Sequence, residues 1–164
     1  MPHEPVIDGL EFASAGARQQ GTWPASGFPR LRDVLASDAG ELAYEIEGVH
    51  DERGRPALRL RVRGMLQLRC QRCLEPMAFE VRTDETLVLA VSVAEIHAEP
   101  ADAHAADRVV AGREMPVREL IEDEIILAVP YAPRHESCSA RLSPDADGKT
   151  SPFAGLRGLL GGKH

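Results

Sequence analysis

A pair of cysteines separated by two residues, in Cys70-Gln71-Arg72-Cys73, is the feature of this chain best suited to chemistry. A CxxC turn can direct two sulfur atoms toward one point, and thiolates are preferred ligands of zinc. A structural zinc site needs four such ligands. His135 and Cys138 lie three residues apart farther along the chain and could supply the other two. The sequence therefore predicts a candidate Cys3His zinc site formed by Cys70, Cys73, His135 and Cys138.

Three alternatives to a zinc site stay open from the residues alone: buried thiols without a metal, a redox dithiol, and a metal site that has degenerated. The spacing of His135 and Cys138 permits a site but does not diagnose one. A thioredoxin-like redox centre has its CxxC at the N-terminus of a helix, whose dipole lowers the pKa of the first thiol. Here Leu74-Glu75-Pro76 leads into another predicted strand instead. Zinc is therefore favoured over redox chemistry.

The rest of the sequence shows no recognisable pattern of catalytic residues. It has no glycine-rich phosphate loop, no paired histidines at helical spacing, and no nucleophile with a neighbouring base at a known spacing. We therefore expect neither enzymatic activity nor a small-molecule substrate.

Arginines alternate with apolar residues on the predicted strand that precedes the CxxC turn. The apolar positions are Leu58, Leu60, Val62, Leu66 and Leu68, and the arginines beside them are Arg59, Arg61, Arg63 and Arg69. A period of two is typical of a strand with one buried and one exposed face. We expect the exposed face, together with Arg72 in the turn, to be basic and able to bind RNA phosphates.

The charges are unevenly distributed along the chain, whose net charge is −7. Residues 53–82 contain eight arginines and two acids, whereas residues 83–124 contain eleven acids and three arginines. A basic sheet face would thus lie in an acidic protein. The alternative is a solvated strand whose arginines pair with Glu45 and Glu47 of a neighbouring strand. Aromatic residues make up 4% of the chain and none lies among these arginines, so base stacking on single-stranded RNA is not expected.

The patterns predict an α+β fold with a twisted or partly barrelled antiparallel sheet, flanking helices and the CxxC turn between two strands. Alternation predicts strands over residues 42–47, 58–69 and 77–93, with a turn at 51–56. Helices are predicted over residues 13–20, 29–36 and 117–129. The third helix begins after Pro116 and ends at Pro130, and Glu119, Glu122 and Asp123 are expected to face water.

We expect one domain over residues 1–164 with two irregular segments. The length allows a single ordinary core. Residues 95–112 follow neither period and are rich in Ala, Asp, Glu and His, which predicts a mobile acidic loop with His97 and His104 solvated. Residues 139–164 are predicted to form a loop and a short apolar tail.

The location expected from the sequence is the cytoplasm. No apolar run reaches the roughly 18 residues needed to span a membrane, and the first ten residues lack a basic and then apolar leader. Three cysteines, an odd number, do not form a closed disulfide framework. We therefore expect a soluble protein without a membrane partner.

Three motifs resemble, in order, those of the YceD family, the bacterial large ribosomal RNA subunit accumulation proteins. They are CQRCLEPM, LIEDEIILAVPYAPRHESC and SPFAGLRGLL, and the segment ARQQGTW…LRDVLAS is similar to the family's opening. The resemblance implies a role in the synthesis, processing or accumulation of large-subunit ribosomal RNA, without a known enzymatic activity. Members with more cysteines carry further Cys pairs after the proline, which look like a metal site. Here only Cys138 matches, with His135 as the substitute.

Two functional hypotheses follow from the residues and the resemblance together. In the first, the arginine face and the CxxC turn contact the large-subunit ribosomal RNA precursor, because guanidinium groups suit phosphates. In the second, the protein is an adaptor that recruits a ribosomal protein or assembly factor through its acidic loop and apolar C-terminal segment, without contacting RNA. A pI near 5.4 favours the adaptor. A redox enzyme using Cys70 and Cys73 ranks third.

Overall fold

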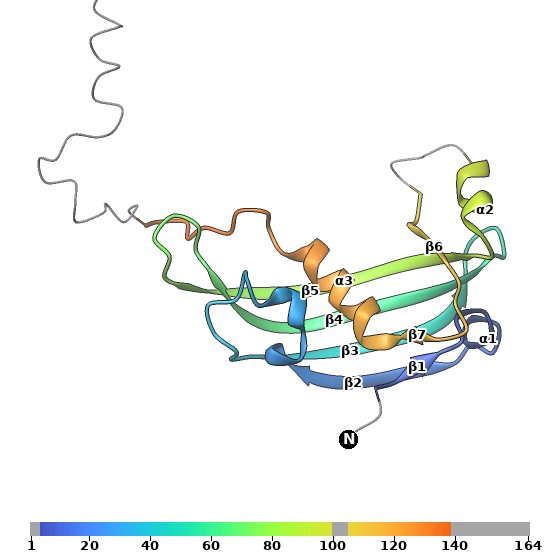
Figure 1. The fold of residues 1–164 in the computed structure, drawn as a ribbon, viewed down its shortest axis with the longest axis horizontal. Coiled ribbons are helices and arrows are strands. Elements are labelled where there is room, and N and C mark those ends of the chain that lie inside the picture. Colours follow the sequence, from blue (N-terminus) through green and yellow to red (C-terminus); the bar gives the residue numbers. More distant parts are fainter. Residues whose placement is uncertain (1–3, 100–104, 139–164) are drawn as a thin grey trace, which may run out of the picture.

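Five strands form one curved, open sheet, seen along its length in Figure 1. The computed structural model describes residues 4–99 and 105–138. The strand order is β2-β3-β4-β5-β6, and all neighbours are antiparallel except β5 and β6. The strands are β2 (Arg18–Pro24), β3 (Glu41–His50), β4 (Pro56–Arg69), β5 (Pro76–Ala90) and β6 (Arg108–Val110). The predicted α+β class is confirmed, with a sheet that is not closed into a barrel.

Short helices and a small second sheet complete the described part. The helices are α1 (Gly9–Ser14), α2 (Val93–Ala98) and α3 (Val117–Ala128), and the 3-10 turns are η1 (Ala25–Gly27) and η2 (Pro29–Leu31). Strand β1 (Val6–Ile7) pairs with β7 (Met115–Pro116). Within the described ranges, no helix is long and apolar enough to cross a membrane.

The predicted hairpin and the strands beside it are confirmed. The Asp51 N–H donates to the Arg55 carbonyl over 2.9 Å, and the Gly54 N–H donates back to the Asp51 carbonyl over 2.9 Å. Gly54 has a φ of +75°, which glycine adopts without the steric cost of a side chain. Strands β4 and β5 then pair without interruption. This long ribbon carries the CxxC turn at one end.

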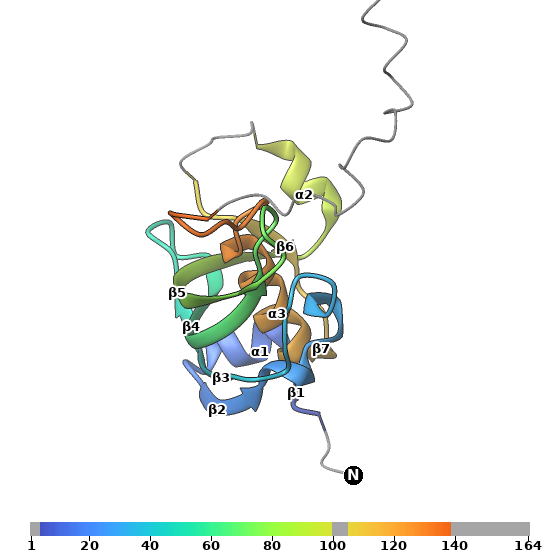
Figure 2. The same cartoon turned by 90° about the vertical axis from the view of Figure 1, so that its left-hand side faces the viewer.

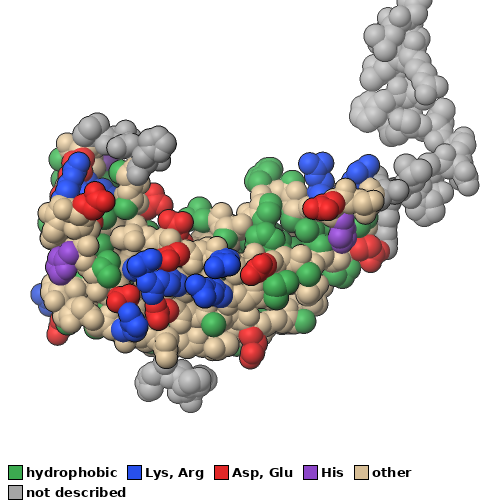
Figure 3. All heavy atoms as spheres, turned by 180° about the vertical axis from the view of Figure 1, so that it is seen from behind, with side chains coloured by type: hydrophobic (Ala, Val, Ile, Leu, Met, Phe, Trp, Pro, Cys, Tyr) green, Lys and Arg blue, Asp and Glu red, His purple; other side chains and the backbone are tan. Residues whose placement is uncertain are grey.

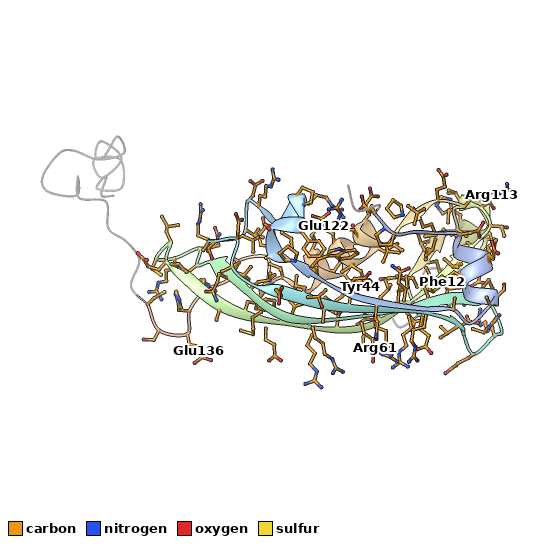
Figure 4. The ribbon with its side chains drawn as sticks, turned by 90° about the horizontal axis from the view of Figure 1, so that it is seen from below. Phe12, Tyr44, Arg61, Arg113, Glu122 and Glu136 are labelled. Carbon is orange, nitrogen blue, oxygen red and sulfur yellow. The ribbon has the colours of Figure 1, made fainter. Side chains whose placement is uncertain are left out.

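The alternation in β4 separates a buried face of the sheet from an exposed one. The inward side chains Leu58, Leu60, Val62, Leu66 and Leu68 are fully buried. Helices α1 and α3 lie on this face, and Figure 4 shows them on the side of the sheet opposite to Arg61. Figure 2 shows the same layering from the end of the sheet, with α3 beside β4 and β5. No helix of the described residues therefore covers the arginine face.

Helix α3 matches the predicted helix, but the exposure of one of its acidic residues was predicted wrongly. Glu122 was predicted to face water and is instead only 3% exposed. Its carboxylate accepts the Arg30 backbone N–H over 2.7 Å and the Arg30 Nε–H over 2.8 Å. The neighbouring Asp123 accepts from Nη1 of Arg30 over 2.6 Å. The prediction failed because η2, far away in the sequence, packs on that side of α3.

Loss of the Glu122 carboxylate is expected to destabilise the fold. In Glu122→Gln the amide would place an N–H donor against one of the Arg30 donors, leaving a buried polar group unsatisfied at a cost of about 2 kcal/mol. Urea unfolding of this variant, of Arg30→Ala and of the double variant gives a double-mutant cycle. The double variant should lose less free energy of unfolding than the sum of the two single losses. Fully additive losses would show that the contact does not hold η2 against α3.

The N-terminal helix predictions were wrong in position and extent. The helix predicted over residues 13–20 lies instead at Gly9–Ser14, where the Asp8 side chain caps it by accepting the Glu11 N–H over 3.0 Å. Gly16, with a φ of +59°, follows the end of this helix. The next residues pair with β3 and become β2, because the edge of β3 offers them a full row of hydrogen bonds.

Of the helix predicted over residues 29–36, only the 3-10 turn η2 forms. The rest runs along the part of β4 that extends beyond β3. There the Ala36 N–H donates to the Gln67 carbonyl over 2.7 Å, and the Arg69 N–H donates to the Val34 carbonyl over 2.9 Å. These backbone groups of β4 would otherwise lack partners, and pairing with them prevents a helix.

The predicted loop over residues 95–112 contains two regular elements that the sequence did not indicate, α2 and β6. Helix α2 begins at Val93, with the Ser92 hydroxyl accepting the Glu95 N–H over 3.2 Å as a helix cap. Residues 108–110 form β6, whose partner is the end of β5. His97 is exposed, as expected. His104 and the predicted apolar tail within 139–164 lie outside the described residues.

Candidate metal centre and basic face

The two cysteines of the CxxC motif lie in a tight turn between β4 and β5. The Leu74 N–H donates to the Cys70 carbonyl over 2.9 Å, and the Cys70 N–H donates to the Glu75 carbonyl over 3.0 Å. Leu74 adopts a φ of 64°, in the left-handed region, which costs a side-chain-bearing residue roughly 1 kcal/mol. Cys70 is fully buried and Cys73 is 8% exposed. The turn therefore holds both thiols on its inner side.

The segment after α3 returns to this turn and brings the second half of the predicted site. The Gln71 N–H donates to the Pro133 carbonyl over 2.8 Å, which fixes this segment beside the turn. The ligand atoms of Cys70, Cys73, His135 and Cys138 all lie within 4.8 Å of one another. The structure therefore brings together all four residues of the candidate Cys3His set.

Two of the separations between these ligand atoms match those expected around a tetrahedral ion. The Cys70 and Cys138 sulfurs are 3.8 Å apart, and the Cys73 sulfur lies 3.4 Å from His135 Nδ1. Tetrahedral zinc with Zn–S bonds of about 2.3 Å and Zn–N bonds of about 2.1 Å requires separations of about 3.8 Å and about 3.6 Å. Both observed distances are close to these values.

The other ring nitrogen of His135 is held by the backbone. His135 Nε2 lies 3.1 Å from the Pro76 carbonyl oxygen. A carbonyl only accepts, so Nε2 donates this hydrogen bond, and Nδ1 is the ring nitrogen that lies toward the Cys73 sulfur. Metal-binding histidines are oriented by this kind of outer hydrogen bond. The ring is therefore oriented with Nδ1 toward the other candidate ligands, as a metal at this site requires.

Two thiols of the centre, those of Cys70 and Cys138, have shifted pKa values. Burial alone would raise the pKa of Cys70, but backbone N–H groups of Cys73, His135 and Arg72 favour its thiolate and bring the pKa to about 5. Burial and the neighbouring Cys70 and Cys73 raise the pKa of Cys138. A bound cation would counter both effects and favour the thiolate form of Cys138.

Two of the predicted RNA-binding arginines are already paired with acids on the exposed face. Arg59 binds Asp84 through two hydrogen bonds of 2.6 and 2.8 Å. Arg61 pairs with Glu45, lies 3.6 Å from Glu47 and lies 3.4 Å from Asp84. Figure 3 shows the resulting mixture of basic and acidic side chains in the middle of this face. At these two positions the structure agrees with the alternative of a solvated, ion-paired strand.

The other three predicted arginines, Arg63, Arg69 and Arg72, are exposed and form no ion pair with another described residue. Arg63 lies directly opposite Arg82 in the pairing of β4 with β5. Arg82 is also exposed and was not among the predicted site residues. Counting back from the CxxC turn along an antiparallel ribbon would have placed Arg82 beside Arg63 and Asp84 beside Arg61.

The family model of the large ribosomal RNA subunit accumulation protein YceD matches residues 58–160. The chain belongs to the YceD family. The matched region begins in β4 and includes the CxxC turn, α3 and all four candidate metal ligands. The resemblance expected from the motifs is therefore confirmed, and the YceD family connects the chain to accumulation of large-subunit ribosomal RNA. No solved structure matches the chain.

Proposed function

We propose that this YceD-family protein is a cytoplasmic, non-enzymatic factor that supports synthesis, processing or accumulation of large-subunit ribosomal RNA by binding RNA phosphates. The observation that carries the proposal is the set of exposed guanidinium groups of Arg63, Arg69 and Arg72, which have no acid partner among the described residues. They lie on the uncovered face of β4 and in the adjoining turn. Arg59 and Arg61 contribute less because binding RNA would require them to exchange their carboxylates for phosphates.

Duplex RNA is the form of RNA that fits this surface. Proteins recognise RNA duplexes mainly through phosphates and 2′-hydroxyl groups, and guanidinium groups bind phosphates with charge-assisted hydrogen bonds. The outer face of β4 has no aromatic side chain on which a base could stack. The partner we propose is therefore a structured part of the large-subunit ribosomal RNA precursor.

We further propose that Cys70, Cys73, His135 and Cys138 hold a structural zinc ion. Four protein ligands fill a tetrahedral zinc and leave no open position for a substrate, as in sites that serve folding. The ion would join the CxxC turn to the segment after α3. It would thereby fix the end of the β4–β5 ribbon, where Arg69 and Arg72 lie.

Reversing the charge of Arg63, Arg69 and Arg72 to Glu is expected to remove bound RNA. The tagged protein is captured from growing cells at low and at high salt, and the bound RNA and proteins are identified. Wild type should retain large-subunit precursor RNA that is lost as salt rises, because phosphate contacts release counterions. The triple variant should retain at least about tenfold less at low salt, equivalent to the loss of about 1.4 kcal/mol of binding.

The matched control reverses three exposed arginines elsewhere, Arg32, Arg53 and Arg113, to Glu. It changes the net charge equally and should keep the RNA. Equal loss of RNA in the test and control variants would show a general charge effect. Full retention of RNA by the Arg63, Arg69 and Arg72 triple variant would remove this surface from the proposal.

The adaptor hypothesis is the second candidate, and exposed apolar side chains favour it. Leu127 on the last turn of α3 is 74% exposed, and Tyr131 just after it is fully exposed. An adaptor would retain a protein partner at high salt without RNA. Deletion of residues 152–160, which lie outside the described part, should then abolish that capture.

A further inference from the structure

Part of one long edge of the sheet has no strand beside it among the described residues. Strand β5 pairs with β4 over nearly its whole length, but β6 pairs with its other side only from Val88 to Ala90. Over residues 78–86, the described part of the chain provides no strand partner on that side. The opposite edge of the sheet, β2, is shorter and ends at Pro24, which has no N–H to donate. The open part of β5 is therefore the edge better suited to pairing with another strand.

The backbone groups that point out from this edge can be identified from the ladder. The Val88 N–H donates to the Asp107 carbonyl and the Ala90 carbonyl accepts the Ala111 N–H, so both residues face away from β4. Successive residues of a strand alternate between its two neighbours, and the pairing with β4 shows no interruption. The unpaired N–H and C=O groups therefore belong to Ala78, Glu80, Arg82, Asp84 and Thr86.

The side chains along this edge define what could pair with it. Glu80 and Arg82 lie on the exposed face and form no ion pair with another described residue, and Arg82 lies opposite Arg63. Two arginines side by side favour an incoming acid. Asp84 is already bound to Arg59. On the other face, α3 packs on β5 and exposes Ile126 and Leu127 in its last turn.

The shape beside the edge fits one extended segment better than a whole second sheet. Figures 1 and 2 show α2 rising beyond β5 at one end and the segment leading to Cys138 rising at the other. In Figure 3 the margin of the molecule along β5 dips between these raised ends. We therefore expect a single extended strand to reach this edge more readily than another folded domain, which would meet the raised ends first.

We propose that the open edge of β5 binds an extended segment of a partner protein as an added strand. Main-chain hydrogen bonds to Glu80, Arg82 and Asp84 would supply much of the affinity, as in other cases of strand addition. Specificity comes from an acid opposite Arg82, a base opposite Glu80, and apolar side chains on the face toward Ile126 and Leu127. This interaction rests on the backbone of β5 and not on the proposed RNA function, although the partner's acid would lie near Arg63 of the RNA surface, so either proposal can fail without the other.

The first test measures amide hydrogen exchange in the free protein by NMR. The N–H groups of odd-numbered residues in 78–86 bond to β4 and should exchange slowly, whereas those of Glu80, Arg82 and Asp84 should exchange at least about a hundredfold faster. Slow exchange at both sets would mean that the edge is already occupied and would overturn the proposal. Protection that disappears on dilution would identify the occupant as a second copy of this chain.

The second test adds a synthetic peptide, Thr-Val-Thr-Val-Asp-Val-Lys, which places Asp opposite Arg82 and Lys opposite Glu80 when it pairs antiparallel. It should bind with a Kd on the order of 1 mM or tighter and slow the exchange of the same amides. Arg82→Pro, which removes only an outward N–H, should weaken binding at least about tenfold while leaving the pairing with β4 intact.

A charge exchange separates strand addition from adhesion to any apolar surface. Arg82→Glu should reject the first peptide and accept Thr-Val-Thr-Val-Lys-Val-Lys, which carries Lys in place of the central Asp. Equal binding of both peptides to both proteins, or shifts confined to Ile126 and Leu127, would overturn the proposed edge. Absence of binding by either peptide at millimolar concentration would overturn it as well.

Discussion

Removal of zinc is expected to lower the melting temperature of this protein by about 10 °C. A metal that binds only the folded state at a thousand times its Kd stabilises that state by about 4 kcal/mol, and 1 kcal/mol corresponds to roughly 2–4 °C for a chain of this size. The purified protein should contain one zinc ion per chain, measured by elemental analysis. Melting with and without a strong chelator then gives the shift.

Variants of His135 distinguish a metal site from a redox dithiol. His135→Ala removes one ligand but leaves Cys70 and Cys73 intact, so a dithiol would keep its thiol chemistry, whereas a zinc site would lose metal and the sensitivity to chelator. His135→Cys restores four ligands and should bind zinc again. Cys70→Ser should lose the metal in either background.

The outcome with His135→Ala is decisive for the centre. Full zinc content in that variant would show that the histidine is not a ligand, despite its 3.4 Å separation from the Cys73 sulfur. If wild-type protein purified without chelator contains no zinc and does not respond to added zinc, the alternative of buried thiols without a metal is supported instead.

Local patterns in the sequence predicted the strands that carry the site, but they did not settle the fourth ligand. The alternation of Leu58, Leu60 and Val62 with arginines defines β4 because burial on one face requires a period of two. Whether His135 returns to the CxxC turn depends on the path of the chain after α3. The contact between Gln71 and Pro133 that fixes this path is long-range, and no local spacing encodes it.

The difference between local patterns and long-range contacts also explains which predictions were wrong. Helical periodicity correctly assigned Glu122 to the side of α3 away from the sheet, yet η2 packs on that side and buries it. Residues 18–24 contain Gly21 and Pro24, which are poor strand formers, and they form β2 because the edge of β3 is available to them. The neutralisation of Arg59 by Asp84 follows from strand register, which the turn at Cys70 and Cys73 determines.

Replacing Glu124 with Gln is expected to stabilise the protein at alkaline pH and to have little effect at acid pH. Glu124 lies on α3, is 4% exposed, and has no charge partner of opposite sign among the described residues. Burial, followed by repulsion from Glu85, Asp107 and Asp123, raises its pKa from 4.5 to about 7. The folded protein therefore binds a proton here that the unfolded chain has already released at neutral pH.

The sign of the pH dependence follows from this difference in protons. Between about pH 4.5 and 7 the folded state holds more protons at Glu124 than the unfolded state does, so stability falls as pH rises through this window. Above pH 7 the loss is complete and amounts to about 3 kcal/mol for a shift of this size. The neutral amide of Glu124→Gln avoids that loss, which leaves the variant more stable than wild type at pH 8 and similar to it at pH 4.5.

Urea unfolding of wild type and Glu124→Gln at several pH values measures the effect as a difference, so the pH dependence of the cysteine centre cancels. Glu119→Gln, an exposed substitution five positions before Glu124 on the same helix, is the matched control and should show no pH-dependent difference. An advantage of Glu124→Gln that is equal at all pH values would mean that packing rather than charge distinguishes the two side chains. A loss of stability at pH 8 would mean that the Glu124 carboxylate has a stabilising partner in the folded protein.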